Sequence, residues 1–264
     1  MAVIYACFLQ KKKNNCYICG DVFIMISLFR KEISSFFSSL IGYLVLTVFL
    51  CITGLFLFVF DGNLNILNSG YASIEGLFII APWVFLFLIP AITMRFFSEE
   101  IKSGTIELLL TMPISDFSIV MGKFLAGIAL LFCALVPTLL YFITTYALGS
   151  PVGNIDVGAT IGGYIGLFFI GGIYTAIGAL ISSLTENQIV SFIITATVCF
   201  LLYTGFDFIA ELVPGLSFLT NVGINEHYLS IQRGVIDSRD IIYFVGVIAL
   251  CIYFTTLSIA KKRK

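Results

Sequence analysis

Side chains that could carry out catalysis are few in this sequence. The single histidine, His227, excludes metal sites built from several histidines, including the HExxH pattern of zinc hydrolases. The one Gly-Lys pair, Gly122-Lys123, is followed by Phe124, so the phosphate-binding loop GxxxxGKS/T is absent. We therefore predict that the chain is not an enzyme and that any nucleotide hydrolysis takes place on a partner subunit.

Two further features could bind an ion. Cys16 and Cys19 form a CxxC pair, but with no second CxxC and no histidine nearby the pair lacks the ligands of a zinc site. Asp207 is the ionisable residue closest to the core of a predicted membrane span, where it would either cap the next turn or couple to an ion. We favour the capping role for Asp207, and we expect no metal and no cofactor.

Charged residues return in the segment 95–123, RFFSEEIKSGTIELLLTMPISDFSIVMGK. Its apolar residues can line one broad helical side: Phe96, Phe97, Ile101, Leu108 and Leu109. The other side would then expose Glu99, Glu100, Lys102, Ser103 and Glu107. Gly104 interrupts this pattern and Pro113 limits it, so we predict two short helices lying on the membrane surface. A connector without further function is the alternative.

Small residues recur every four positions at Gly158, Gly162 and Gly166. Four-residue spacing places them on one helix face, where the missing side chains let another backbone approach closely. We predict that this face packs against another helix; a role in lining a substrate path is the alternative.

The composition identifies the solvent around these elements. Of the 264 residues, 59% are hydrophobic and only 11% are charged, and the mean hydropathy is +1.08. Soluble chains carry about 25% charged residues on average, so this chain lacks the polar surface for water and must lie in lipid. With a net charge of -1, it has no basic field for nucleic acid.

The hydropathy pattern predicts an all-α membrane protein with six transmembrane helices, each long enough to cross roughly 30 Å of hydrocarbon. The predicted spans are 40–60, 77–94, 119–148, 157–180, 189–209 and 241–260. Before the first span, residues 29–39 have the amphipathic pattern of a helix lying in the membrane interface. Residues 210–240 are expected to hold one or two partly inserted helices.

Lysine and arginine set the orientation, because positive charge near a span stays on the cytosolic side. Under six spans, the segment 95–123 and the terminal KKRK share one side, and only Arg233 and Arg239 lie opposite. We therefore expect both termini in the cytosol.

The N-terminal residues 1–24 differ in composition from the rest of the chain and lack the features of a signal peptide. We interpret them as a non-native or disordered extension. Met25 would be the natural start, and residues 25–264 would form one transmembrane domain.

The run SEEIKSGTIELLLTMPISDFSIVMGKFLAG, residues 98–127, resembles the signature of type-2 ABC exporter permeases, whose membrane subunits are known as the ABC-2 family. Its ordered elements are a glutamate-bearing loop, a Ser-Gly-Thr turn, a proline and a Gly-Lys pair. The segments FRKEISSFFSSLIGYLVL and HYLSIQRGVIDSRDIIYF look like those of the GldF group of gliding-motility permeases within this family.

The resemblance implies two membrane subunits of six helices each, docked on two cytosolic ATPase subunits. By resemblance, the coupling and gate region contains Glu99, Glu100, Gly104, Thr105 and Glu107. Glu186, in the loop SSLTENQ, would be a second contact. For the GldF group the resemblance also implies a GldA-like ATPase, a GldG-like partner or second membrane subunit, and a place in the bacterial inner membrane.

The residues alone allow two other functions. An ion-coupled secondary transporter would need polar ligands near the middle of the membrane, and the sequence shows few. A membrane anchor that organises a motility or secretion complex would need no transport path. The spans present generic apolar and small residues, which identify no substrate.

Overall fold

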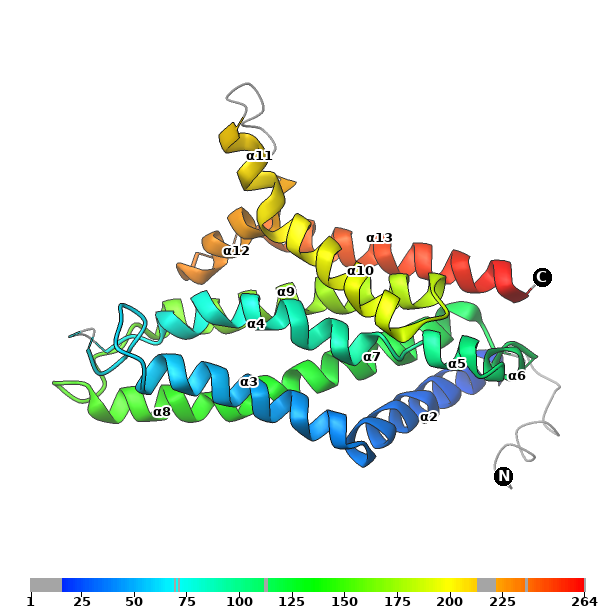
Figure 1. Cartoon of the computed structure of the whole chain (residues 1–264), viewed down its shortest axis with the longest axis horizontal. Coiled ribbons are helices and arrows are strands. Elements are labelled where there is room, and N and C mark those ends of the chain that lie inside the picture. Colours follow the sequence, from blue (N-terminus) through cyan, green and yellow to red (C-terminus); the bar gives the residue numbers. More distant parts are fainter. Residues whose placement is uncertain are drawn as a thin grey trace.

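The computed structural model describes residues 16–68, 70, 72–111, 114–212, 222–235 and 237–263, with side chains from residue 24 onward except that of residue 41. Every regular element among these residues is helical, which confirms the predicted all-α fold (Figure 1). The elements are α2 (Cys16–Ser38), α3 (Leu40–Phe58), α4 (Glu75–Thr93), α5 (Ser98–Lys102), α6 (Thr105–Thr111), α7 (Asp116–Leu135), η1 (Val136–Thr138), α8 (Leu139–Leu148), α9 (Val157–Leu184), α10 (Gln188–Phe200), η2 (Leu201–Gly205), α11 (Phe206–Leu212), α12 (Ile224–Gln232) and α13 (Ser238–Arg263).

Five helical stretches of the described chain are long and apolar enough to cross a membrane: Glu75–Lys102, Asp116–Leu148, Val157–Leu184, Gln188–Leu212 and Ser238–Arg263. Each contains one of the predicted spans from the second to the sixth. The bent pair formed by α2 and α3 brings the total to as many as six. The structure therefore agrees with a multi-pass membrane protein.

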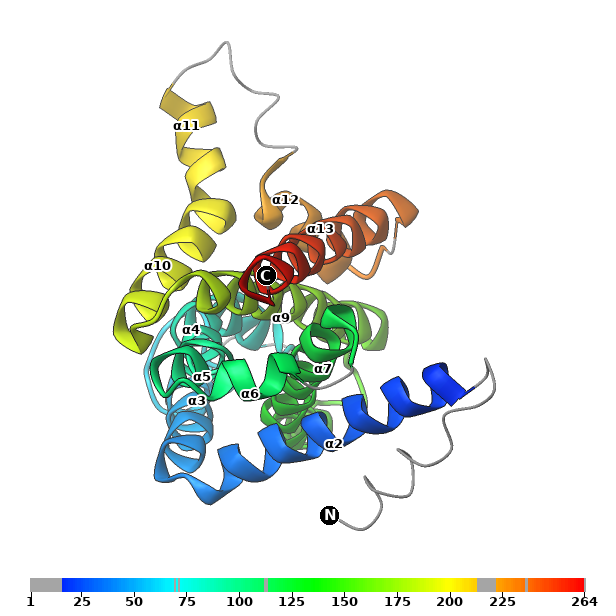
Figure 2. The same ribbon diagram turned by 90° about the vertical axis from the view of Figure 1, so that its right-hand side faces the viewer.

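The first predicted span, 40–60, corresponds to α3, and the predicted interfacial helix corresponds to the last part of α2. The chain bends by 71° between these two helices, and Figure 2 shows α2 running across the end of the bundle that also contains α5 and α6. The bend lies at Ser39, whose backbone is extended (φ = -95°, ψ = 140°) and whose hydroxyl accepts the Gly42 N–H at 3.3 Å to cap α3. The helix α2 is longer than expected: residues 16–24, assigned above to an N-terminal extension, are helical, while residues 1–15 lie outside the described chain.

Other helices also begin at a capping side chain. Asp156 accepts the N–H of Ala159 at 3.0 Å at the start of α9, and Asn187 accepts that of Ile189 at 2.9 Å at the start of α10. Such caps satisfy N–H groups that lack a partner within the helix. They fix where the turns end and the spans begin.

The helix α9 is the centre of the bundle. It packs against α4, α7, α10, α12 and α13, and 78% of its apolar window is buried, against 17% for α13. Glycine makes this packing close: a Cβ at Gly171 would collide with the side chain of Leu131, and one at Gly178 with Thr93. The outer helices therefore pack around one glycine-rich axis.

The stretch Gln188–Leu212 changes its helical winding before it ends. It passes through a π-helical turn, η2, into α11, which leaves the bundle (Figure 1). Residues 210–240 were predicted to hold one or two partly inserted helices. Their described part contains the short helix α12, and residues 213–221 and 236 lie outside the described chain. The Tyr228 hydroxyl of α12 donates to the Phe78 carbonyl at 2.6 Å, so α12 lies on the bundle.

The two ends of the bundle collect different segments (Figure 1). One end, called here the charged end, contains α2, α5, α6, the start of α7 and the end of α13. The opposite end contains the turns after α3 and α8 together with α12. The segments predicted to be cytosolic therefore come together at one end.

Candidate functional site

At the charged end, α5 and α6 form the two short helices predicted for the loop. Gly104 separates them with φ = +71°, a left-handed conformation that other residues adopt only with strain. The Ser103 hydroxyl donates to the Glu99 carbonyl at 2.8 Å and ends α5. Pro113, expected to limit the second helix, lies outside the described residues.

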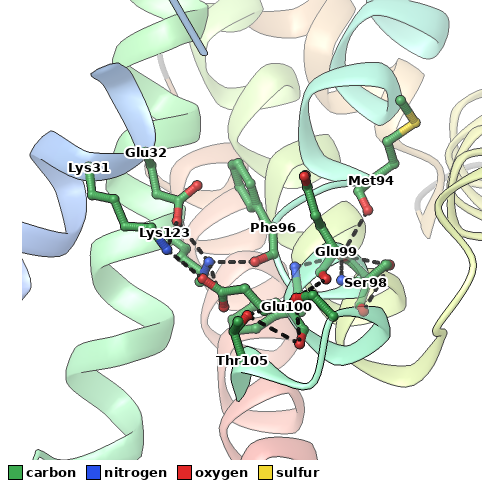
Figure 3. Close-up of polar contacts among 12 residues, drawn as sticks. Lys31, Glu32, Met94, Phe96, Ser98, Glu99, Glu100, Thr105 and Lys123 are labelled. Carbon is green, nitrogen blue, oxygen red and sulfur yellow. Dashed lines mark hydrogen bonds and ion pairs between the residues drawn. The ribbon is translucent and has the colours of Figure 1, made fainter. Parts of the chain in front are cut away.

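Four charged side chains from three segments meet beneath α5 (Figure 3). Nζ of Lys123 lies 2.8 Å from Glu32 Oε1 and 3.0 Å from Glu100 Oε2. Nζ of Lys31 lies 2.8 Å from the other Glu100 oxygen and 3.8 Å from Glu32. We call Lys31, Glu32, Glu100 and Lys123 the ion-pair cluster. It joins α2, α5 and α7.

Lys123 is the buried member of the cluster, with a side chain only 1% exposed. Besides the two carboxylates, its ammonium donates to the Phe96 carbonyl and lies 5.1 Å from the centre of the Phe97 ring. A buried ammonium is tolerated only with such compensation, since removing its partners leaves an uncompensated charge. Lys123 therefore holds the turn before α5 against α7.

A second anchor holds the start of α5 to α9. The Ser182 hydroxyl accepts the N–H groups of Phe97 at 2.9 Å and Ser98 at 3.1 Å, and donates to the Met94 carbonyl at 3.2 Å. The Ser98 hydroxyl donates in turn to the Ser182 carbonyl at 3.2 Å. Together with the ion-pair cluster, these bonds fix α5 to α2, α7 and α9.

The end of α13 is fastened to the segment that follows α6. Arg263 Nη1 lies 2.9 Å from Asp116 Oδ1, and Nη2 donates to the Ile114 carbonyl at 2.9 Å. The segment that carries α5 and α6 is thus held on both sides.

The residues assigned to coupling have different surroundings. Glu99, Gly104, Thr105 and Glu107 are exposed. Glu100 was expected on the exposed side, but this is wrong: its side chain is only 12% exposed, because Lys31 and Lys123 bind it.

The apolar side of α6 also differs from the expectation. Leu108 is 67% exposed, although it was expected to line the apolar side, and Ile106 is buried in its place. The turn at Gly104 rotates α6 relative to α5, so a single helical pattern across both cannot give their buried faces.

Glu186 is exposed in the loop between α9 and α10. The preceding residue, Thr185, lies beside α5, with its hydroxyl 3.4 Å from that of Ser98. The structure therefore brings this loop next to α5.

The glycines spaced by four on α9, Gly158, Gly162 and Gly166, lie at the opposite end of the bundle. A Cβ at Gly162 would collide with the Ile231 carbonyl, and one at Gly166 would lie 2.8 Å from the Tyr228 ring. Gly158 is exposed, and its backbone lies against Gly234. This face packs on α12 and its end, away from the ion-pair cluster.

The anchoring contacts of five residues were not predicted from the sequence: Lys31, Glu32, Lys123, Ser182 and Arg263. A signal was present for Lys123, because a lone charge in the first turns of an apolar span needs a partner.

Among the residues described, no three His, Cys, Asp or Glu side chains gather as a metal site.

The fold and the charged end define a multi-pass helical membrane protein with a fixed pair of short surface helices. The family model described as ABC-2 family transporter protein matches residues 25–235. The chain belongs to this family and is thus a membrane permease subunit of an ABC transporter, a class of subunit that works with a separate ABC ATPase. Among curated proteins, none matches the chain.

Proposed function

We propose that the chain couples ATP hydrolysis by a cytosolic ATPase to export across the bacterial inner membrane, and that α5 and α6 are the docking element. The observation that carries this proposal is the two-sided character of α5: Glu99 is exposed, whereas the adjacent Glu100 is bound inside the ion-pair cluster. One side is available to a partner and the other is fixed to the bundle.

The docking surface would combine charge with apolar area. Glu99, Lys102 and Glu107 are exposed, and Leu108 is 67% exposed on α6. An apolar side chain surrounded by a polar, charged rim has the general layout of a protein–protein interface. Glu186, in the loop beside α5, extends the surface as a second contact.

The anchors below α5 would carry a movement into the membrane. A displacement of α5 acts on α2 and α7 through the ion-pair cluster and on α9 through Ser182. Rigid elements that move together in this way support switching between two arrangements. A loop without anchors would move alone.

The proposed orientation places the charged end and both termini in the cytosol. Lysines and arginines gather there: Lys31, Arg95, Lys102, Lys123 and Arg263 all belong to it. This distribution is the one that cytosolic flanks of spans show.

The resemblance of the segments around residues 29 and 227 to GldF supports a narrower proposal. The chain would serve gliding motility with a GldA-like ATPase and a GldG-like partner or a second membrane subunit. A reporter of surface gliding after deletion of the gene tests this part separately.

Charge reversal on the exposed side tests the docking element. We expect the double variant Glu99→Lys, Glu107→Lys to lose co-purification with the cognate ATPase and the stimulation of its hydrolysis. The matched control is Glu226→Lys, which reverses an exposed charge on α12 at the opposite end. Retention of both binding and stimulation in the double variant would show that docking lies elsewhere.

A further inference from the structure

A cavity of about 240 Å³ lies beside the ion-pair cluster, between α2, the end of α4, α5 and α7. Its lining changes character along its length. Polar side chains surround it at α5 and the turn after it, including Glu99, Ser103 and Thr105, and apolar side chains line it at Ala91 and Leu130. We call it the α2–α5 cavity.

The cavity runs from the surface of the charged end into the bundle. Lys123 and Leu130 both line it and lie seven residues apart on α7, about 10 Å along a helix. Residues of α2 from Lys31 to Phe36 also line the cavity, and α2 crosses the end of the bundle (Figure 2). A space that is polar at the membrane surface and apolar below it fits an amphiphile.

The charges of the lining single out two side chains. Six charged residues line the cavity, and four of them form the ion-pair cluster, in which two lysines balance two glutamates. The other two are Arg95 and Glu99. Neither forms an ion pair within 4 Å among the described residues, and Nε of Arg95 is buried without a hydrogen-bond partner.

We propose that the α2–α5 cavity binds the head group of a phosphoethanolamine lipid, with the phosphate at Arg95 and the ammonium at Glu99. Guanidinium groups bind phosphate oxygens in paired, charge-assisted hydrogen bonds. A primary ammonium offers three N–H donors to a carboxylate. One unpaired charge of each sign matches a zwitterion, while the apolar end accepts the start of an acyl chain.

This charge pattern also predicts selectivity. A phosphocholine head group has no N–H donor for Glu99, and a phosphoglycerol head group has no cation at all. Both keep the phosphate that Arg95 would bind. Selection of phosphatidylethanolamine over both lipids therefore depends on Glu99 as well as on Arg95.

The test uses the permease–ATPase complex taken from vesicles of equal parts phosphatidylethanolamine, phosphatidylcholine and phosphatidylglycerol. Native mass spectrometry then identifies the retained lipid. We expect phosphatidylethanolamine to be enriched roughly tenfold, the factor that one charge-assisted hydrogen bond supplies. Arg95→Gln should lose lipid retention, and Glu99→Gln should lose the selectivity while still retaining lipid.

Matched controls change the same residue types away from the cavity. Arg30→Gln on α2 and Glu226→Gln on α12 alter exposed residues that do not line it, and both should keep the enrichment. Arg95→Lys keeps the charge but loses the paired geometry, so it should retain lipid at an intermediate level. This variant keeps the test decisive if Arg95→Gln does not fold.

Several results would overturn the proposal. Equal retention of the three lipids in the wild type would do so, as would unchanged selectivity in Glu99→Gln. Displacement of the lipid by millimolar inorganic phosphate, together with equal retention, would show a simple anion site. ATPase co-purification is measured on Arg95→Gln and Arg95→Lys, because Arg95 lies outside the proposed docking surface, so loss of lipid with intact docking is distinguishable from failure of the docking proposal.

Discussion

The two ends of the bundle are held together by different forces. At the charged end, ion pairs and side-chain hydrogen bonds join segments far apart in sequence, as between Lys123 and Glu32 at 2.8 Å. At the opposite end, close backbone contact is added to such bonds: Gly162 lies against the Ile231 carbonyl and Gly234, beside the hydrogen bond from Tyr228 to Phe78. Charged contacts are lost when one partner is removed, whereas close packing is lost when an atom is added.

Removal of the buried ammonium should have the largest effect. Lys123→Met leaves Glu32 and Glu100 with only the exposed Lys31 as a cation, and breaking a buried pair in this way costs about 3–5 kcal/mol. We expect a large fall in the thermal unfolding temperature of the purified protein. Lys102→Met, an exposed lysine on α5, is the control. Equal stability of the two variants would mean that the ion-pair cluster does not hold this end.

An added methyl group should affect the opposite end by a smaller amount. The Cβ of Gly162→Ala would collide with the Ile231 carbonyl, and overpacking of this kind costs about 1–3 kcal/mol. Gly246→Ala on α13 is the control, because no atom lies within 4 Å of its added Cβ and alanine favours a helix. The same unfolding assay checks both. If Gly162→Ala were as stable as this control, close backbone packing would not stabilise the opposite end of the bundle.

The smallest effect is expected at the end of α13. Arg263→Gln breaks the ion pair with Asp116 at 2.9 Å, but the arginine side chain is 32% exposed. Partly exposed pairs contribute about 0–1 kcal/mol, since water and salt screen them. Chemical denaturation at low and high salt measures this contribution, which should shrink at high salt. A loss as large as that of Lys123→Met would place the main anchor of the charged end at α13.

Hydropathy was sufficient to predict the spans, because lipid-facing helices need long apolar runs whatever their neighbours are. Five of the six predicted spans lie within single helical stretches of the structure. The break at Gly104 was also predictable, since its cause is local: glycine tolerates φ = +71°.

Which of the two adjacent glutamates is exposed and which is bound to the bundle was not predictable. Glu99 and Glu100 are chemically identical neighbours, yet one is exposed and the other is bound by Lys31 and Lys123. The side of α5 that faces inward depends on how α2 and α7 are placed, which no local pattern encodes. The anchoring role of Ser182 was not predictable for the same reason, because its hydrogen-bond partners lie 84 to 88 residues away along the chain.

The ion-pair cluster has a consequence for a membrane that carries a voltage. Moving one elementary charge across the field requires about 2.3 kcal/mol per 100 mV. The cluster contains two lysines and two glutamates, so its net charge is zero. In the joint movement of α5, α2 and α7 proposed above, the membrane potential would therefore exert no net force on these four charges.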